Sequence, residues 1–423
     1  MKNFIPIILL AFFAFSCAQE TGNNHTLTPD ADNGGLVLPE GFSAIVVADE
    51  LGRGRHIEVN DNGDIYVSLR QHSENKGIVC LRDTTGNGKA DIIKYAGEHV
   101  GTGIKIHKGH LYFGADDEVV RYSMQEGKLL PDDSWERIAY GFPQEGQHEA
   151  KPIEFDGNGN MYVTVGAPSN ACMEQTRTKG SPGMDPCPLL EYSGGIWRFS
   201  ESTPNQYLRE DGKRYATGIR HAVAIRWNKQ VNELYAVQHG RDQLHQFFPD
   251  LYTDKENAEL PAEEFLHVTE GSDFGWPYCY FDWMQDKKVL GPEYGGNGMV
   301  QGRCENKKDP IMAFPGHMAP NDLLFYTGNM FPEKYKNGAF IAFHGSWNRA
   351  PEPQKGYFVV FVPFGDENPS GDWEVFADGF AGEEVIESTR DAEYRPCGLA
   401  QGPDGSLYVV DSNKGKVWRI IHK

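Results

Sequence analysis

A histidine and two arginines occupy corresponding places in the chain, each just before a short apolar segment. His148 precedes Ile-Glu-Phe at 153–155, Arg220 precedes Ala-Val-Ala-Ile, and Arg395 precedes Gly-Leu-Ala. A neutral imidazole can remove a proton from a hydroxyl group. Guanidinium groups bind carboxylates through charge-assisted hydrogen bonds. Taken singly, His148 is explained as a surface histidine and Arg220 as part of a loop ion pair, but polar residues that recur at matched strand entries would converge at one end of the fold.

Further polar and aromatic residues gather on predicted loops. His-Gly-Arg-Asp at 239–242 ends a strand, and Gly240 lets backbone carbonyl groups approach a ligand or cation closely. Calcium accepts backbone carbonyls and carboxylates as ligands. Gly-Trp-Pro-Tyr-Cys at 275–279 and Phe-His-Gly-Ser-Trp-Asn-Arg at 343–349 place tryptophan beside glycine, which suits a flat aromatic ligand or a sugar ring. The alternatives are a strand-ending turn for the first segment and core packing for a single tryptophan.

The elements that would position these residues form a repeat. An apolar residue, a polar turn with glycine and an aromatic residue flanked by aliphatic residues recur at 57–67, 153–163 and 399–409, with looser copies at 104–112, 225–235 and 325–343. Asp-Gly and Asn-Gly pairs between apolar runs predict hairpins, because the turn needs positive φ. Roughly six such units predict an all-β fold, a six-bladed β-propeller with its chemistry in loops at one end of a channel.

Composition agrees with many short strands and tight turns. The chain of 423 residues has 48 glycines and 12% aromatic residues, and it shows no sustained helical periodicity. Residues 37–423 are expected to form one propeller, since each blade packs only on its neighbours. The net charge of −20 argues against nucleic acid as a partner, because phosphate binding needs clustered Lys and Arg. The acidity is explained either by solubility or by acidic loops that hold a cation.

The N-terminus resembles the export signal of a bacterial lipoprotein. A positively charged start is followed by an apolar run over 4–15, which is too short to span a bilayer, and then by Ser-Cys17. We expect a signal peptide over 1–17 with lipidation of Cys17, or an ordinary signal peptide cut nearby. Residues 18–36 are rich in Asn, Thr, Asp and Gly, which predicts a flexible tether. The expected location is the periplasm, the outer membrane or the cell surface, with the lipid as the only membrane anchor.

Of the 7 cysteines, six remain when Cys17 is set aside. In an exported protein, cysteines commonly form disulfides. Two loops rich in glycine and proline are each bracketed by a pair, which predicts the disulfides Cys172–Cys187 and Cys279–Cys304. Cys80 and Cys397 lie in the first and last repeats, where closure of the ring could bring them together. Neither the Cys-x-x-Cys spacing of metal sites nor the Cys-x-x-Cys-His haem motif is present.

Together these segments resemble the soluble glucose and sorbosone dehydrogenase family, and more closely its sorbosone and pyranose dehydrogenase branch. The resemblance runs from about Pro39 to Arg419. Its most specific signals are Gly-Trp-Pro-Tyr-Cys at 275–279, His-Gly-Ser-Trp-Asn-Arg at 344–349 and Arg-Pro-x-Gly-Leu-Ala at 395–400. Members of that family are six-bladed β-propellers that use pyrroloquinoline quinone (PQQ) and calcium, so the resemblance implies both cofactors here.

The resemblance also implies residue roles. His148 matches the catalytic base, and Arg220 matches the arginine that contacts the quinone oxygens. His221 stands where asparagine is usual, at a position that contacts the cofactor. Arg395 matches one of two arginines that close the cofactor site, and the second falls on Cys397. The remaining matches are carbonyl ligands of calcium at Gly240 and Arg241 with Asp242 as an extra ligand, a cofactor-carboxylate clamp at Arg349, and cofactor contacts at Trp347 and Asn348.

The implied activity is oxidation of a sugar, a sugar aldehyde or a related polyol by hydride transfer to PQQ. Electrons would pass to an external acceptor, a cytochrome or a quinone, since no haem or flavin motif is present. Two alternatives stay open. A metal-dependent propeller lactonase would need carboxylate and Asn ligands where this chain has arginines. A surface propeller that binds carbohydrate without catalysis would use the same aromatic loops, and the departures at His221 and Cys397 leave room for it.

Overall fold

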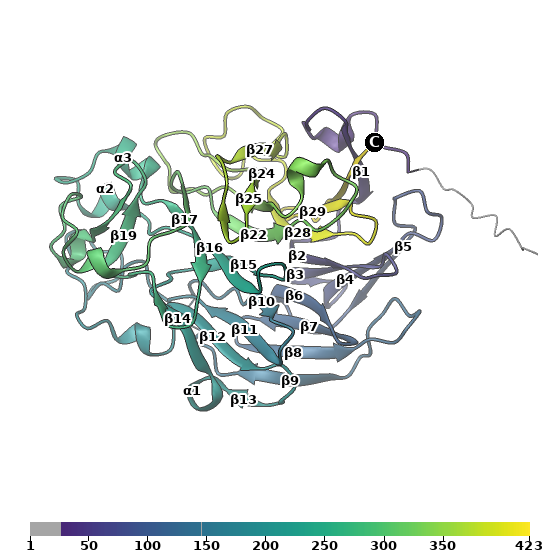
Figure 1. The fold of residues 1–423 in the computed structure, drawn as a ribbon, viewed down its shortest axis with the longest axis horizontal. Helices are drawn as coiled ribbons and strands as arrows, with labels where there is room; N and C mark the ends of the chain where they lie inside the picture. Colours follow the sequence, from purple (N-terminus) through teal and green to yellow (C-terminus); the bar gives the residue numbers. More distant parts are fainter. Residues whose placement is uncertain (1–26, 145) are drawn as a thin grey trace, which may run out of the picture.

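The computed structural model describes residues 27–144 and 146–423 as a ring of six β-sheets, each of four or five strands (Figure 1). The first strand of every sheet lies along the central channel and contacts the first strands of both neighbouring sheets: β2, β6, β10, β15, β22 and β28. Closed radial repetition of this kind is a β-propeller. The six-bladed all-β fold predicted from the repeat is therefore confirmed.

The blades follow one another in chain order. Their strands are β2 Gly54–Val59, β3 Ile65–Ser73, β4 Lys76–Arg82 and β5 Ile92–Ala96; β6 Gly101–His107, β7 His110–Ala115, β8 Glu118–Ser123 and β9 Trp135–Tyr140; β10 Ile153–Phe155, β11 Asn160–Val165, β12 Gly195–Ser200 and β14 Lys213–Thr217; β15 Ala222–Asn228, β16 Glu233–Gln238, β17 Glu263–Val268 and β21 Met312–Phe314; β22 Pro320–Phe325, β23 Ala339–Phe343, β24 Phe358–Val362 and β27 Glu374–Ala377; and β28 Pro396–Gln401, β29 Leu407–Asp411, β30 Val417–His422 and β1 Phe42–Ala48.

The remaining elements are short and lie in the loops or at blade edges. Two small strands extend blades in parallel, and two hairpins stand apart from the ring: β13 Gln206–Tyr207 and β18 Ser272–Asp273, then β19 Cys279–Asp282 with β20 Lys287–Leu290 and β25 Phe364–Gly365 with β26 Asn368–Pro369. The helical turns are α1 Leu208–Asp211, α2 Leu244–Phe247, α3 Asp254–Glu259, η1 Asn33–Gly35, η2 Pro188–Glu191, η3 Pro292–Tyr294, η4 Gly302–Asn306 and η5 Glu333–Tyr335.

The sequence repeat corresponds to the first two strands of each blade. Its hairpin turns contain Gly63, Gly159 and Gly405, with φ of 87°, 96° and 89°, a conformation that residues with a Cβ rarely adopt. The aliphatic and aromatic residues of the repeat then pack between blades. Tyr66 from the first blade, for example, lies in one cluster with Phe113 from the second. The hydrophobic core is thus a set of layers between neighbouring blades.

The ring closes between the two ends of the described chain. β1 pairs with β30 in antiparallel register, so that Phe42 lies opposite His422. The segment before β1 packs on the same blade, since Asp30 and Asn33 accept from backbone N–H groups of β1. Trp418 Nε1 also donates to the carbonyl of Gly34 at 3.0 Å. The predicted flexible tether over 18–36 is therefore wrong for 30–35, because these contacts hold that part in place.

Two other predictions concern the cysteines. The expected signal peptide and the lipidation of Cys17 lie outside the described residues. Cys80 and Cys397 are free and buried, so the pairing suggested by ring closure is wrong. Cys80 lies on β4 between the first two blades, whereas Cys397 lies on the innermost strand of the last blade. The last and first blades are neighbours in the ring, but the third strand of one blade lies farther from the channel than the first strand of the next. Ring closure therefore does not bring the two cysteines together.

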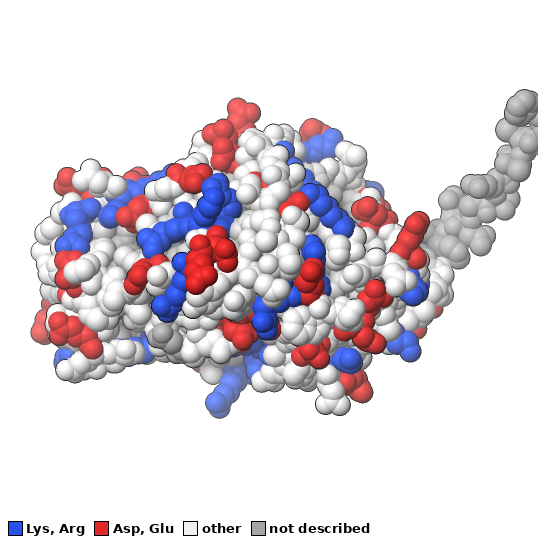
Figure 2. All heavy atoms as spheres, turned by 90° about the horizontal axis from the view of Figure 1, so that it is seen from below, with Lys and Arg blue, Asp and Glu red and all other residues white. Residues whose placement is uncertain are grey.

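Charged side chains of both signs are mixed on the surface of the protein. Acidic and basic side chains lie interspersed over the face seen in Figure 2, so the charge of −20 is not gathered into one acidic patch there. Among the described residues, no helix has the length and apolar character needed to cross a membrane.

A layer of alternating charges fills the narrow part of the channel. Four inner strands contribute Glu58, Lys105, Glu154 and Arg226, each opposite the tyrosine of its own repeat. Lys105 Nζ lies 3.0 Å from Glu58 and 3.1 Å from Glu154. Arg226 lies within 3.9 Å of both carboxylates and 3.6 Å from Asp322. Because these groups are largely withdrawn from water, each depends on its neighbours for compensation.

Above this layer, the inner strands become irregular. Five of them have a register shift near their first residues: β2, β6, β15, β22 and β28. Bulges re-aim side chains and are common beside active sites. Here they turn polar side chains toward one another across blades. Arg55 Nε donates to Thr102 Oγ1 at 3.4 Å, and Asn321 Nδ2 lies 3.6 Å from Cys397 Sγ.

We predict that Arg226→Met lowers the free energy of unfolding by about 3–5 kcal/mol, because it leaves the buried Asp322 without its cation and leaves Glu58 and Glu154 to share Lys105 alone. Chemical denaturation followed by circular dichroism measures the change. Arg198→Met is the matched control, since its partner Glu270 has a 64% exposed side chain, and exposed pairs contribute about 0–1 kcal/mol. Equal losses in both variants would contradict a stabilising role for the charged layer.

Candidate functional site

The candidate site lies at the end of the channel where the inner strands begin. Loops that precede inner strands carry His148, Arg220 and Arg395, and loops that follow second strands carry His239 and His344. Rings of His148 and His221 are 4.6 Å apart, and rings of His221 and His239 are 5.0 Å apart. The structure therefore brings the predicted histidine and arginines from separate blades to the same end of the molecule.

The imidazole of His148 is held in a single tautomer. Its Nδ1 lies 2.5 Å from the carbonyl of Ala167, which only accepts hydrogen bonds. The proton must therefore sit on Nδ1, and Nε2 carries a free lone pair. Burial and the nearby guanidinium of Arg220 lower the pKa of His148 to about 3. A neutral imidazole with Nε2 unprotonated is the form that a general base requires.

His148 is the first of three imidazoles in a row. His221 stacks on it at an interplanar angle of 27°, and His239 meets His221 edge-on. Gly166 makes this possible, because a Cβ there would lie 2.7 Å from the Cβ of His148 and 3.0 Å from Nδ1 of His221. Burial lowers the pKa of His221 and that of His239, the latter to about 4. All three rings are thus neutral at physiological pH, and Nδ1 of His221 is buried without a hydrogen-bond partner in the part of the chain that the structure describes.

Arg220 is buried, and burial lowers its pKa. Four of its five N–H groups donate to protein acceptors. Nε and Nη2 donate to the carbonyl and the side-chain oxygen of Asn170 at 3.1 and 3.0 Å. Nη1 donates to the carbonyl of Gly240 at 2.8 Å, and Nη2 also donates to Asp242 at 2.7 Å. Arg220 therefore acts on the site through its charge next to His148, with four of its five donors already paired.

The carboxylate of Asp242 is the common partner of several loops. Oδ2 accepts from Arg220 and from Arg177, the latter at 2.9 Å. Oδ1 accepts from the amide of Asn348, and the backbone carbonyl accepts from Asn170 at 2.9 Å. Despite burial, these cations hold the pKa of Asp242 well below its usual range. Asn170 and Arg177 are site residues that the repeat pattern did not reveal, since both lie on a long loop.

These contacts do not suit the calcium site that the resemblance implies at 240–242. The carbonyl of Gly240 already accepts from Arg220, and both carboxylate oxygens of Asp242 face guanidinium or amide groups. The guanidinium of Arg241 is paired with Glu293. Among the described residues, no group of three or more His, Cys, Asp and Glu side chains is arranged to hold a metal ion. The Gly240 carbonyl and both carboxylate oxygens of Asp242 are thus already engaged by side chains of the protein.

Two other arginines keep donors for a ligand. Arg55 has one hydrogen bond, to Thr102, and Arg395 donates to the carbonyls of His344 and Gly345. Within the described part of the chain neither forms an ion pair, and each repels the other electrostatically. His344 is fixed between them and Ser412, and burial keeps its pKa well below its ordinary value. The mouth of the channel is therefore positive in an acidic protein.

Arg55 escaped the sequence analysis although a signal was present. Arg55 and His56 precede the repeat at Ile57, much as Arg220 and His221 precede the repeat of the fourth blade. Matching the residues before each repeat would have found it.

The three residues of the loop at 344–349 that were expected to contact the cofactor differ in where they lie. Asn348 lies in the site through its bond to Asp242, and its Oδ1 is buried without a partner. Trp347 is 54% exposed. Arg349 departs from its predicted role as a carboxylate clamp: it is buried, and its three nitrogens donate to backbone carbonyls and to Glu259, the last at 2.7 Å. The ion pair between Arg349 and Glu259 holds the loop at 344–349 against α3.

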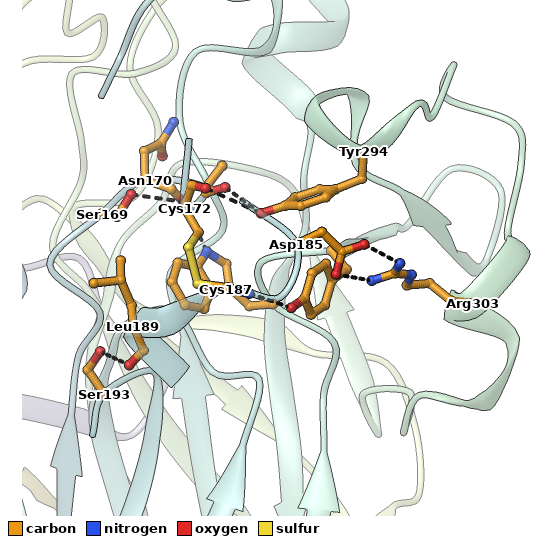
Figure 3. Close-up of a disulfide and its surroundings, with 12 residues drawn as sticks. Ser169, Asn170, Cys172, Asp185, Cys187, Leu189, Ser193, Tyr294 and Arg303 are labelled. Atoms are coloured by element: carbon orange, nitrogen blue, oxygen red, sulfur yellow. Dashed lines mark hydrogen bonds and ion pairs between the residues drawn. A yellow bond between two sulfur atoms is a disulfide. The ribbon is translucent and has the colours of Figure 1, made fainter. Parts of the chain in front are cut away.

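Both predicted disulfides are present, Cys172–Cys187 and Cys279–Cys304. Figure 3 shows the first one beside Asn170, on the loop that follows β11. The two disulfide loops are joined to each other, since Arg303 pairs with Asp185 and Tyr294 donates to the carbonyl of Ala171 at 3.1 Å (Figure 3). These links fix the loop that carries Asn170 and Arg177 over the end of the channel.

Comparison with known proteins agrees with this architecture. The chain is 27% identical over 415 residues to an uncharacterized protein of Borreliella burgdorferi, with 92% of this chain and 91% of that protein covered. It is 26% identical over 280 residues to the pyrroloquinoline quinone-dependent pyranose dehydrogenase of Coprinopsis cinerea. That second match covers 57% of this chain and 36% of the length of the fungal protein.

Solved structures show the same fold. The holo PQQ domain of the Coprinopsis cinerea pyranose dehydrogenase has a TM-score of 0.74 at 18% identity, covering 92% of this chain and 97% of that one. A calcium structure of the Trichoderma reesei carbohydrate-active enzyme family AA12 has a TM-score of 0.74 at 18% identity, covering 95% and 100%. The resemblance to PQQ-dependent soluble sugar dehydrogenases is thereby confirmed. The TrAA12-like family model matches residues 36–423, and the chain belongs to that family.

Proposed function

We propose that this protein is a PQQ-dependent dehydrogenase that oxidises a sugar, a sugar aldehyde or a related polyol. One observation carries the proposal: His148, a neutral imidazole with a free Nε2, lies at the same end of the channel as the guanidinium groups of Arg55 and Arg395, neither of which forms an ion pair in the described chain. Unpaired cations beside a general base are suited to an acidic ligand and a proton transfer. The family membership supports the same reading.

The residues present fit the quinone. Its carboxylates match Arg55 and Arg395, which have donors left for a ligand. Three buried polar atoms around the site also lack partners: Nδ1 of His221, Oδ1 of Asn348 and the hydroxyl of Tyr357. Buried polar groups normally have a hydrogen-bond partner, so these atoms are placed to meet a polar ligand. When bound, PQQ supplies an electrophilic quinone carbon that accepts a hydride.

The chain itself contributes proton transfer and orientation. Nε2 of His148 takes the hydroxyl proton of the substrate while hydride leaves the same substrate carbon. The Ala167 carbonyl keeps the ring in the tautomer that can accept this proton. Stacking against His221 fixes the plane of the ring. The charge of Arg220 disfavours premature protonation of His148, and Asp242 offsets part of that effect once the imidazolium forms.

The electron acceptor and the location of the protein are part of the same proposal. We propose an external electron acceptor, a cytochrome or a quinone, and export as a lipoprotein through Cys17. The lactonase alternative is disfavoured, because Arg220 and Arg395 stand where metal ligands would be needed. The carbohydrate-binding alternative is tested by adding PQQ to the purified protein. A visible band that bleaches on addition of sugar supports the dehydrogenase, and a lack of saturable uptake supports the binding protein.

For catalysis, we predict that His148→Ala lowers turnover by about 10²–10⁴, the usual contribution of a general base. A dye-linked assay with cofactor-loaded enzyme and the sugar that wild type oxidises fastest measures the loss. His72→Ala, which removes an exposed histidine, serves as the control and should keep full activity. Turnover of the loaded His148 variant within about tenfold of wild type would remove His148 from this role.

The pH dependence follows from the environment of His148. Its pKa is lowered to about 3 by burial and by Arg220, against an ordinary value of 6.5. A lowered pKa keeps the imidazole unprotonated as the pH falls, so we predict that kcat/KM stays nearly constant from about pH 7 down to about pH 5. A dye whose colour is independent of pH is needed. An acidic limb centred near the ordinary histidine pKa would contradict this prediction.

For cofactor binding, we predict that Arg55→Gln raises the Kd for PQQ by about 10-fold to 100-fold, since a hydrogen bond to a charged group contributes about 1.5–3 kcal/mol. Titration of the purified protein with PQQ, followed by visible absorbance, gives the Kd. Arg53→Gln is the matched control, because Arg53 lies two residues earlier and is exposed. The same affinity in both variants would show that Arg55 does not hold the cofactor.

A further inference from the structure

The acceptor atoms at 240–242 form a cation site that the chain fills by itself. Asp242 supplies one negative charge, and two guanidinium groups, those of Arg177 and Arg220, lie within 2.9 Å of the same carboxylate oxygen. The Gly240 carbonyl is taken by Arg220. Guanidinium groups thus occupy the place where carbonyl and carboxylate oxygens would otherwise coordinate a hard divalent ion.

The charged residues next to Asp242 do not supply the negative charge that a further cation would need. Arg241 is neutralised by Glu293 within the protein. The carboxylate of Asp242 and the two guanidinium groups bonded to it together carry one net positive charge. A divalent ion would be repelled there, and it would have to displace two charge-assisted hydrogen bonds.

Arg177 is the distinctive member of this arrangement. It lies on the loop closed by Cys172–Cys187, and its side chain is 30% exposed, whereas that of Arg220 is 3% exposed. Its guanidinium also donates to Gln243 and, at 3.5 Å, to Gln147, the residue before His148. Arg177 therefore links the disulfide loop, the Asp242 carboxylate and the segment that carries the base.

We propose that the guanidinium of Arg177, together with that of Arg220, replaces calcium in this chain, so that the quinone binds without a divalent metal. The inference rests on the proposed quinone-dependent function. Cofactor uptake then depends on fixed charges that a chelator cannot remove. Removal of Arg177 leaves Asp242 with one guanidinium partner in place of two, which removes the net positive charge that opposes calcium binding.

The first experiment uses the wild-type chain. PQQ is titrated into metal-free protein in the presence of excess EDTA and, separately, of millimolar Ca²⁺. We expect the two Kd values to agree within about threefold. An increase of about tenfold or more in EDTA, reversed by Ca²⁺, would overturn the inference. A lack of saturable uptake under both conditions would instead overturn the proposed function on which the inference rests.

The second experiment needs no quinone. Ca²⁺ alone is added to the wild type and to Arg177→Met, and the thermal unfolding midpoint is followed, since a ligand that binds only the folded state raises it. We expect no shift for wild type and a saturable increase for the variant. Arg303→Met is the matched control. It removes an exposed arginine whose partner, Asp185, lies on the Cys172–Cys187 loop that also carries Arg177. It should behave like wild type.

A saturable shift in wild type, or the same response in Arg303→Met and Arg177→Met, would show that Arg177 does not block the cation site. If Arg177→Met does not fold, the wild-type titrations in EDTA and Ca²⁺ still decide whether the quinone needs calcium.

Discussion

A charged or polar group inside a narrow channel needs a partner, and this requirement organises the whole molecule. In the lower channel the partners are other side chains, as where Lys105 and Arg226 alternate with glutamates from neighbouring blades. Near the mouth the same rule leaves exceptions. Among the described residues, Arg55 and Arg395 have no carboxylate partner, and Nδ1 of His221 has no hydrogen-bond partner. Since such groups are costly to bury, their gathering at one end marks the place where a ligand completes the structure.

Much of the fold and part of the site could be predicted from the sequence, because the signals are local. Each hairpin is specified by a few adjacent residues, such as the glycine with positive φ at Gly63. Once the repeat is known, the residue just before an inner strand must face the channel end, and this is how His148, Arg220 and Arg395 were found. The disulfides were equally accessible, since each closes one loop. Arg55 does not follow this rule, because it lies inside β2 and reaches the channel end through the register shift near the start of that strand.

The rest depends on contacts between loops, which no repeat encodes. Arg177 reaches Asp242 because a disulfide loop folds back over the channel, and the sequence gives no indication of that path. Arg349 was expected to bind a carboxylate of the cofactor. Its nitrogens instead donate to Glu259 and to backbone carbonyls of the protein. The tether prediction failed for a similar reason. Residues 30–35 have the composition of a linker, yet Trp418 and two N–H groups of β1 provide partners for them.

The pairing of β1 with β30 has a consequence for biosynthesis. The outermost strand of the last blade is synthesised before the first blade, whereas the three strands that complete it follow the other five blades. Until β30 is made, Phe42–Ala48 lacks its strand partner, and an unpaired strand edge is open to wrong pairing with other chains. The ring therefore cannot be finished blade by blade in the order of synthesis, and its closure must wait for β28, β29 and β30.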